Sequence, residues 1–561
     1  MKFTLVFLSF ISLLNITGHS QDLSPYTLNN SLYAVESTEV YVGDSLNIAA
    51  LHAEDLILES NFPRAGVIAE TDLNLNNSGT WFDLPNGDKL WRMILKVPNA
   101  HAVSVYFSEF TIPFGATLHA YSPKYVEILP TFTFDNNPER GYYATDYVRG
   151  EVMILEYLEP KGTQGTAKVV INGLNGFYKM IPSLEEERFE ENDRAGTCQV
   201  DVSCSEGDDW RRQIDGVVRI TVTSNGSSGF CSGSLVNNTA EDCKPYILSA
   251  HHCATNDNDI NATTSDFQQW IFRFNYQHKS CTSPLIIGSY SKTGCVKLAN
   301  STNNGGILGS DYLLVELTEA LDETRTPYFN GWDATSSASD NGVSIHHPAG
   351  DEKKISTYDE TLTSSNWSTS PNGSHWRVKW IATANGHGVS EGGSSGSPIF
   401  NEEKLIVGQL SGGLSECADV NPNGQTLPDL FGKMSYNWSG SANVQLISTF
   451  LDPVGNGTTK VMEGNYYLCS QGAGTVNSIT EHQELESVSV YPNPAQKQFS
   501  IAIETTENID VIIFNQVGKE VVRFNNYEVN SPINISYLSS GLYYVRVGEN
   551  GIFTTKKLVV E

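Results

Sequence analysis

Residues 393–398 read Gly-Ser-Ser-Gly-Ser-Pro, and residues 250–253 read Ala-His-His-Cys. The first stretch sets a serine in a turn walled by glycines, and the second places a histidine beside a cysteine. A serine hydroxyl becomes an effective nucleophile when a neighbouring imidazole takes its proton. Glycines beside the serine allow backbone N–H groups to converge on the oxyanion of the transition state. Together the two stretches predict a hydrolase that acts through an activated serine.

The glycine-walled stretch offers three serines in different settings. Ser395 is third in a Gly-x-Ser-Gly-x-Pro pattern, and we predict that it is the nucleophile. Its own backbone N–H and that of Gly393 are then expected to bind the oxyanion. Ser394 and Ser397 are expected to be structural.

The base is expected to be His252 rather than His251, because His252 directly precedes Cys253 and a disulfide there would fix its loop. The third member should be an acid just ahead of a buried strand, and Asp311 directly precedes the apolar run 312–317. Its carboxylate would accept the imidazole N–H and stabilise the imidazolium. The order His, Asp, Ser is that of chymotrypsin-type enzymes. We therefore expect an all-β, chymotrypsin-like double β-barrel.

Composition limits the compartment and the partners of the chain. Its 561 residues carry a formal net charge of −29, whereas phosphate binding needs clustered lysine and arginine, which argues against nucleic acid as a partner. Residues 1–20 are interpreted as a signal peptide, in which Lys2 precedes an apolar run at 5–16 that is too short to span a bilayer. All nine cysteines lie at or after Cys198, as suits export to an oxidising compartment. The sequence predicts a secreted protein with no stable membrane span.

The cysteine-free block 21–194 shows strand patterns, including a hairpin pattern at 81–97 around a Pro-Asn-Gly turn. The charged segment 185–194 closes this block and is expected to be an exposed linker. We expect the block to be a β-rich propeptide that assists folding and masks the site. A binding module that stays in place is the alternative.

Residues 195–468 contain short apolar strands and little helical periodicity, which favours a pair of β-barrels. The polar stretch 469–487 is expected to be a linker. Residues 488–561 are predicted to form a last small β-sandwich.

Four motifs mark this last unit, namely Tyr-Pro-Asn-Pro at 491–494, Val-Gly-Lys at 517–519, Leu-Ser-Ser-Gly-Leu-Tyr at 538–543 and Lys-Lys-Leu-Val at 556–559. They resemble the C-terminal sorting domain of the type IX secretion system. The resemblance implies export by that machinery to the extracellular space or the cell surface, with removal of the tail. A small adhesive sandwich is the alternative.

The region 196–452 carries further motifs, including Cys-Gln-Val-Asp-Val at 198–202, Gly-Ser-Leu-Val-Asn-Asn-Thr at 233–239 and Ile-His-His-Pro at 345–348. With the serine stretch, they resemble the bacterial lysyl endopeptidases, chymotrypsin-fold enzymes that cut after lysine. The resemblance implies three disulfides and leaves two cysteines to pair with each other, in departure from the family. The expected pairs are Cys198–Cys417, Cys204–Cys281, Cys231–Cys253 and Cys243–Cys295. No partner is expected for Cys469.

The same resemblance assigns specificity. Asp429 matches the pocket aspartate of the family, whose buried carboxylate would favour lysine before the cut bond. A turn cap after Pro428 is the alternative role for Asp429. Trp367 matches a tryptophan that the family stacks against a histidine near the site, but here the partner position holds Ser411. This departure leaves arginine as a second candidate before the cut bond.

These observations predict a secreted serine endopeptidase that hydrolyses protein or peptide substrates on the carboxyl side of lysine through an acyl-enzyme. We expect a monomer without a cofactor. His346 and His347 are expected to serve packing, because no compact ligand spacing supports a metal. A non-catalytic binding or adhesion protein on a degenerate protease fold is the alternative function, and an ester hydrolase is a third.

Overall fold

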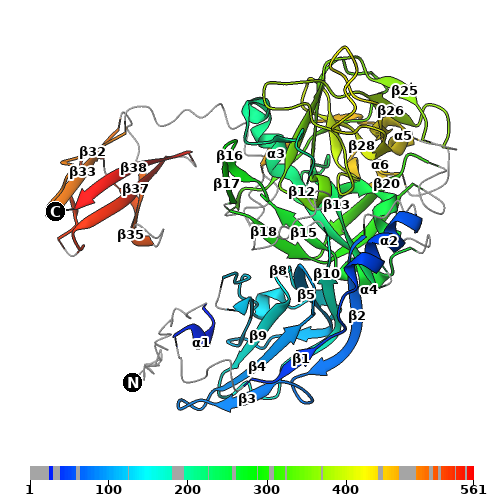
Figure 1. Ribbon diagram of the computed structural model, residues 1–561. Coiled ribbons are helices and arrows are strands. Elements are labelled where there is room, and N and C mark those ends of the chain that lie inside the picture. The colour runs from blue at the N-terminus through cyan, green and yellow to red at the C-terminus, as the bar shows by residue number, and fades with distance from the viewer. Residues whose placement is uncertain are drawn as a thin grey trace, which may run out of the picture. The chain divides into compact units, whose positions relative to one another are not determined.

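The computed structural model is mostly β-structure (Figure 1). The expected signal peptide and both expected linkers lie outside the residues it describes. The described residues are 24–29, 38–58, 64–123, 126–179, 195–224, 226–255, 261–286, 288–301, 309–321, 325–367, 370–439, 446–455, 457–466, 488–503, 509–515, 520–527, 529–536, 538–549 and 552–560.

The N-terminal block is built from two sheets that enclose one core. The first sheet has the order β1 (Val40–Val42), β4 (Lys89–Lys96), β9 (Val152–Glu159) and β6 (Thr117–Tyr121), with β3 (Thr80–Asp83) paired to β4. The second contains β2 (Arg64–Asn74), β10 (Lys168–Phe177) and β5 (Ala102–Thr111). Apolar side chains such as Trp91, Phe107 and Ile171 fill the space between them. The hairpin predicted at 81–97 is confirmed as β3 and β4.

Barrel 1 of the central region follows in the chain. Its strands are hydrogen-bonded in the order β18 (Tyr290–Thr293), β15 (Ile271–Phe274), β12 (Val217–Ser224), β13 (Ser227–Val236), β14 (Tyr246–Ala250), β20 (Tyr312–Leu317) and β19 (Cys295–Asn300). Every residue of β12 is buried, because both faces of this strand are covered. Apolar side chains such as Ile220, Trp270 and Leu313 form the core of the barrel.

Barrel 2 has the strand order β11 (Val200–Asp201), β24 (Lys354–Tyr358), β23 (Gly342–His346), β27 (Pro398–Phe400), β28 (Ile406–Gly413), β29 (Asp429–Lys433), β26 (His375–Val378) and β25 (Thr363–Ser365). A separate apolar cluster joins the two barrels, with Leu248 and Leu314 from barrel 1 and Ile345 and Phe400 from barrel 2. The central region is therefore a chymotrypsin-like double β-barrel, as the sequence predicts.

The N-terminal block continues the sheet of barrel 1. Strand β2 pairs with the start of β13, where Ser227 faces Val67, Ser228 faces Gly66 and Gly229 faces Arg64. The hydrogen-bonded path then runs from β12 and β13 through β2, β10 and β5. Figure 1 shows the blue and cyan strands of the block beside the green strands of barrel 1. The block and both barrels belong to one compact unit that ends at Thr475.

The second compact unit, Val476–Glu561, is a small β-structure. One sheet has the order β32 (Ser489–Tyr491), β33 (Gln498–Ala502) and β36 (Ile533–Asn534), and the other has β35 (Glu520–Tyr527), β34 (Ile509–Asn515), β37 (Gly541–Glu549) and β38 (Ile552–Val560). Its own core contains side chains of both sheets, including Phe499, Val511 and Val545.

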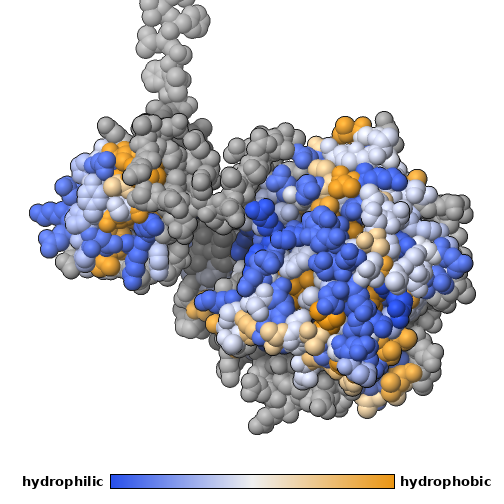
Figure 2. All heavy atoms as spheres, turned by 90° about the horizontal axis from the view of Figure 1, so that it is seen from above, coloured by the Kyte–Doolittle hydropathy of each residue, from blue (hydrophilic) through white to orange (hydrophobic). Residues whose placement is uncertain are grey.

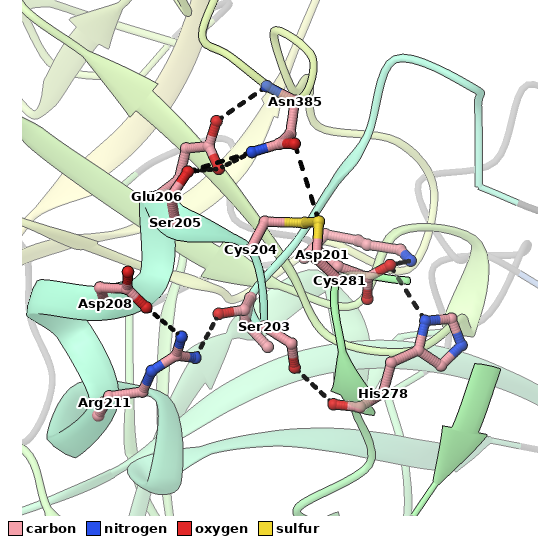
Figure 3. The surroundings of a disulfide bond; sticks show 12 residues. Asp201, Ser203, Cys204, Ser205, Glu206, Asp208, Arg211, His278, Cys281 and Asn385 are labelled. Atoms are coloured by element: carbon pink, nitrogen blue, oxygen red, sulfur yellow. Dashed lines mark hydrogen bonds and ion pairs between the residues drawn. A yellow bond between two sulfur atoms is a disulfide. The ribbon is translucent and has the colours of Figure 1, made fainter. Parts of the chain in front are cut away.

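Three disulfides join pairs of described cysteines in the central region, and they are the three that the family resemblance implies. They join Cys198 to Cys417, Cys204 to Cys281 and Cys231 to Cys253. Figure 3 shows the second of them in a polar surrounding, where Asn385 donates to Glu206 and His278 Nδ1 lies 3.0 Å from Asp201 Oδ2. This hydrogen bond, aided by the charge of Asp201, raises the pKa of His278.

The predicted bridge between Cys243 and Cys295 is wrong. Cys295 is a free cysteine buried in barrel 1, with its sulfur 3.3 Å from the carbonyl oxygen of Phe267, and Cys243 is disulfide-bonded to a different cysteine. The prediction paired the two cysteines that the family pattern left over, whereas the barrel packs the Cys295 thiol among apolar side chains. Cys469 lies outside the described residues.

On the face of the molecule in Figure 2, hydrophobic residues occur in small groups between hydrophilic ones. Among the described residues, the helices are all too short or too polar to cross a membrane.

Candidate active site

His252 and Asp311 meet because the strands beside them are paired. β14 leads into a short 3-10 helix that holds His252, and Asp311 directly precedes β20, the partner of β14. His252 Nδ1 lies 2.6 Å from Asp311 Oδ2, and the backbone N–H of His252 donates to Oδ1 at 3.0 Å. Both residues are buried, at 5% and 3% exposure. The carboxylate thus orients the ring and the loop that carries it.

This arrangement leaves the other ring nitrogen available. With Nδ1 donating to the carboxylate, Nε2 of the neutral ring can accept a proton. Asp311 has a φ of 59°, in the left-handed region that residues other than glycine rarely adopt. Surrounding contacts hold it there, since Gln409 donates to the carbonyl of Ser310 at 2.6 Å. Strain of this kind tends to collect at functional sites.

The ring of His251 has a different environment from that of His252. Burial lowers the pKa of His251 to about 4, although the charge of Asp311 opposes the shift. Its Nδ1 lies 3.1 Å from the side-chain nitrogen of Asn300. His251 is therefore a neutral packing residue at ordinary pH.

The three serines of the glycine-walled turn are not equivalent. Ser394 Oγ lies 2.8 Å from His346 Nδ1 and accepts a hydrogen bond from the backbone of Glu391 at 3.1 Å. Ser397 Oγ lies 3.3 Å from Ser344 Oγ, and both Ser394 and Ser397 have an exposure of 0%. Ser395 is partly exposed. Among the three, its hydroxyl is the one with access to an incoming molecule.

The main chain of Ser395 lies beside the disulfide that fixes the histidine loop. The carbonyl of Ser395 accepts from the backbone N–H of Ser232 at 2.8 Å. It also lies 3.8 Å from the sulfur of Cys253, which follows His252 and is bonded to Cys231. The bridge thus joins the loop of the predicted base to β13, and a backbone hydrogen bond joins β13 to the predicted nucleophile.

A hydrogen bond from Ala349 orients the peptide bond between Gly392 and Gly393. The carbonyl of Gly392 accepts from the backbone N–H of Ala349 at 2.6 Å. Because the carbonyl and the N–H of a trans peptide point in opposite directions, the N–H of Gly393 points away from Ala349. Gly393 has a φ of 95°, and a Cβ there would come within 2.7 Å of the nitrogen of Gly350. Only glycine fits this turn.

Two residues that sequence reasoning missed brace the same turn. Ser232 donates to the carbonyl of Gly393 at 2.9 Å and accepts from the backbone of His347 at 2.9 Å. Glu391 accepts from the backbone N–H of Gly196 with both oxygens, at 3.1 Å each. Burial raises the pKa of Glu391. The sequence signals are weak: a serine after a cysteine, and one acid in a run of glycine and serine.

Asp429 lies at the start of β29 opposite Gly413 and is fully buried. Its Oδ2 accepts from Trp380 Nε1, Ser390 Oγ and Ser415 Oγ at 2.6 Å each, and its Oδ1 from the backbone of Ser415 at 3.1 Å. Burial raises the pKa of Asp429 despite these hydrogen bonds. The carboxylate is thus held by donors from three segments, which a turn cap would not require.

Trp367 lies over the end of β28. A Cβ on Gly412 would come within 2.9 Å of the Trp367 ring, so the ring sits directly on this glycine. Ser411, at the position where the family has a histidine, lies with its Oγ 3.0 Å from His375 Nε2. Burial lowers the pKa of His375 to about 4. The histidine of this region is therefore His375 on β26, and no sequence motif predicts it.

His346 and His347 are packing residues, as expected. His346 bridges Ser394 and Ser356 through its two ring nitrogens, at 2.8 and 3.0 Å. Burial lowers the pKa of His346 to about 3 and that of His347 well below its usual value. Both rings are therefore neutral.

The double barrel, the paired histidine and aspartate and the glycine-walled serine turn define a serine protease. Residues 192–432 match the family model described as lysyl endopeptidase, C-terminal domain. Residues 489–561 match the model described as secretion system C-terminal sorting domain. The chain is therefore similar to lysyl endopeptidases over residues 192–432, and it carries a type IX sorting domain at residues 489–561, which directs it to the extracellular space or the cell surface.

The chain is also similar to individual proteins. A lysyl endopeptidase of Pseudomonas aeruginosa is 27% identical over 361 residues, which is 60% of this chain and 70% of that protein. Among solved structures, the protease Anisep of Arthrobacter nicotinovorans covers 40% of this chain and 91% of its own, at 15% identity and a TM-score of 0.27. A Glu endopeptidase covers 43% and 93%, at 14% identity and a TM-score of 0.27.

Proposed function

We propose that this protease is an endopeptidase that cuts on the carboxyl side of lysine through an acyl-enzyme, with His252, Asp311 and Ser395 as its catalytic residues. The contact of 2.6 Å between His252 Nδ1 and Asp311 Oδ2 is the observation that carries the proposal. It leaves Nε2 as the proton acceptor, on a loop that a disulfide joins to β13, the strand whose Ser232 is hydrogen-bonded to the serine turn.

The chemistry follows the usual order for such a triad. Ser395 Oγ attacks the scissile carbonyl while its proton passes to His252 Nε2, and Asp311 stabilises the imidazolium. The N–H groups of Gly393 and Ser395 stabilise the oxyanion. The imidazolium then protonates the leaving amine, and a water molecule, deprotonated by the same imidazole, hydrolyses the acyl-enzyme.

We assign the preference for lysine to Asp429. A buried carboxylate gains much from an ammonium partner and rejects a neutral side chain, which would leave the charge without compensation. The hydroxyls of Ser390 and Ser415 donate to Asp429. The oxygen of Ser390 can then accept from the ammonium, whereas that of Ser415 already accepts from the backbone N–H of Ser390 at 3.1 Å. Trp367, on Gly412, supplies an apolar surface for the methylene stem.

The division of the chain is part of the proposal. We assign residues 1–20 to a signal peptide, 21–194 to an N-terminal block that is separated from the protease by cleavage, 195–468 to the protease, 469–487 to a linker and 488–561 to the sorting domain. The N-terminal sequence of the secreted protease tests this division.

Digestion of a protein of known sequence tests the function. Fragments that end in lysine are expected, and a Ser395→Ala variant should give none. A fluorophosphonate should label Ser395 in the wild type. Absence of both cleavage and labelling in the folded, secreted wild type would contradict the assignment and leave the binding protein as the alternative.

A further inference from the structure

The N-terminal block and barrel 1 share a surface that resembles the interior of a domain. Beyond the pairing of β2 with β13, the ring of Phe177 stacks on that of Phe230, with 5.7 Å between centroids and 3° between planes. Tyr106 OH lies 3.0 Å from Thr223 Oγ1. Phe177, Phe230 and Tyr147 belong to one buried apolar cluster. Strand pairing and a continuous apolar core are features of permanent interfaces rather than transient ones.

Two arginines of barrel 1 have their acidic partner in the block. Asp146 Oδ2 lies 3.6 Å from Arg273 Nη1, and Asp146 Oδ1 lies 3.9 Å from Arg219 Nη2. Ser291 donates to the same carboxylate at 2.7 Å. Arg219 has an exposure of 0%, and its guanidinium lies over the rings of Tyr147 and Phe230 at 5.2 and 4.8 Å. The block therefore supplies both the charge and part of the aromatic enclosure of this buried cation.

Arg219 also contacts the segment 348–350, which is hydrogen-bonded to the serine turn. Its Nη1 donates to Tyr147 OH at 3.0 Å and to the carbonyl of Gly350 at 3.2 Å. Gly350 ends a short 3-10 turn, Pro348–Gly350, in which Ala349 has a φ of 53°. A left-handed alanine is strained and persists when its surroundings fix it. The N–H of this alanine holds the carbonyl of Gly392, and so sets the direction of the next N–H, that of Gly393.

We propose that the N-terminal block is a resident part of the active protease, which stays docked on barrel 1 after the linker is cut and positions the oxyanion turn through Arg219. The path runs from Tyr147 and Asp146 to Arg219, from Arg219 to the 348–350 turn, and from that turn to the peptide before Gly393. The coupling half of this inference rests on the proposed catalytic role of Gly393 and Ser395. It makes Arg219 a positioning residue, since it touches no reacting atom.

Docking is tested on the secreted full chain. After cleavage in the linker, at Arg188 or Arg194 if an added arginine-specific protease is needed, gel filtration is run under native conditions and each peak is analysed by mass spectrometry. Both fragments should elute together in the peak that cleaves substrate, and separate after denaturation. A protease fragment that elutes alone with the full kcat would overturn the proposal.

Coupling is tested with Arg219→Met, which keeps an apolar stem among the rings and removes the donor to Gly350. We expect kcat and kcat/KM to fall together by about tenfold with KM unchanged, because the loss is confined to the transition state. Arg219→Lys should restore part of the loss. Tyr147→Phe is a milder second variant, expected to lower kcat about twofold to threefold.

The matched control is Tyr106→Phe, which also removes one hydroxyl from the docked surface but has no contact with Arg219. It should leave kcat unchanged. Equal effects of Tyr106→Phe and Tyr147→Phe, or an unchanged kcat in a folded Arg219→Met variant, would contradict the coupling. Fluorophosphonate labelling separates the two proposals: without labelling of the wild type the catalytic assignment fails, whereas co-elution of the fragments still decides whether the block is resident.

Discussion

At the residue scale, the carboxylate of Asp311 makes two contacts with His252. One oxygen binds the imidazole, and the other accepts from the backbone N–H. The place of Asp311 could be predicted because an acid directly ahead of a buried strand lies at the end of a barrel. The left-handed backbone conformation of Asp311 could not be predicted, because nothing in an aspartate side chain requires it. The bracing residues Ser232 and Glu391 were missed for a related reason, because their partners lie far away in the chain.

The role of Asp311 is testable with Asp311→Asn. An amide cannot hold the imidazole in the required tautomer, so kcat should fall by about four orders of magnitude, as for such substitutions in triads generally. Steady-state hydrolysis of a lysyl amide measures the loss. An unchanged thermal unfolding midpoint would show that the fold survives, and a kcat within tenfold of the wild type would refute the role.

The second prediction at this scale concerns Asp429. In Asp429→Asn the buried charge that faces the substrate ammonium is lost, which should cost about 3 kcal/mol of transition-state binding, or roughly a hundredfold in kcat/KM for lysyl substrates. Labelling by a small fluorophosphonate should change little, because that reagent does not use the pocket. An unchanged ratio of lysyl to neutral substrates would favour the turn cap instead.

The third prediction at this scale concerns the reactivity of Cys295. Its thiol is buried and burial raises its pKa, so little thiolate forms. The native protein should resist alkylation by iodoacetamide at Cys295, whereas the unfolded protein should be modified there. Mass spectrometry of the peptide that contains Cys295 measures both. Rapid modification of the native protein would show that this part of barrel 1 opens readily.

At the scale of elements, the disulfide between Cys231 and Cys253 fixes the histidine helix to β13, and Ser232 of β13 is hydrogen-bonded to the serine turn. The strands themselves were largely predictable, since the hairpin of β3 and β4 and the buried strand β20 follow from local apolar patterns and a turn. The pairing of β2 with β13 was not, because any exposed strand edge accepts a partner and the pattern of side chains does not say which. The wrong pair for Cys295 has a different origin, because it joined the two cysteines that the family pattern left over.

Removing that bridge gives the fourth prediction. A Cys231→Ala, Cys253→Ala double variant should lose about 3 kcal/mol of unfolding free energy, as expected for a bridge with a sequence separation of 22 residues. It should also lose activity at temperatures below its unfolding midpoint, because the histidine loop and the serine turn lose their shared anchor. Urea unfolding and kcat, measured on the same sample, test both parts. Lost stability with full activity would show that packing alone sets the site.

At the scale of the whole molecule, the buried charges between block and barrel make docking sensitive to acid. Burial alone would raise the pKa of Asp146, but the charges of Arg273 and Arg219 outweigh it and the pKa is lowered. A lowered pKa stabilises the docked form above the ordinary aspartate range, and this contribution is lost as the pH falls through the lowered value.

The cleaved fragments should therefore co-elute at pH 5 and separate only in strong acid, below about pH 4. Gel filtration across this range measures the midpoint, and Asp146→Asn should remove much of the dependence on pH. A midpoint that is the same in wild type and variant would assign the acid sensitivity to other groups.

The shared sheet also bears on how the protein assembles. A ribosome makes the N-terminal strands first, so β2 is present as a template before β13 emerges, and the first barrel strands have an edge to grow from. Protease made without its leading strands would expose a bare edge next to Phe230, which is the kind of surface that recruits other chains into aggregates.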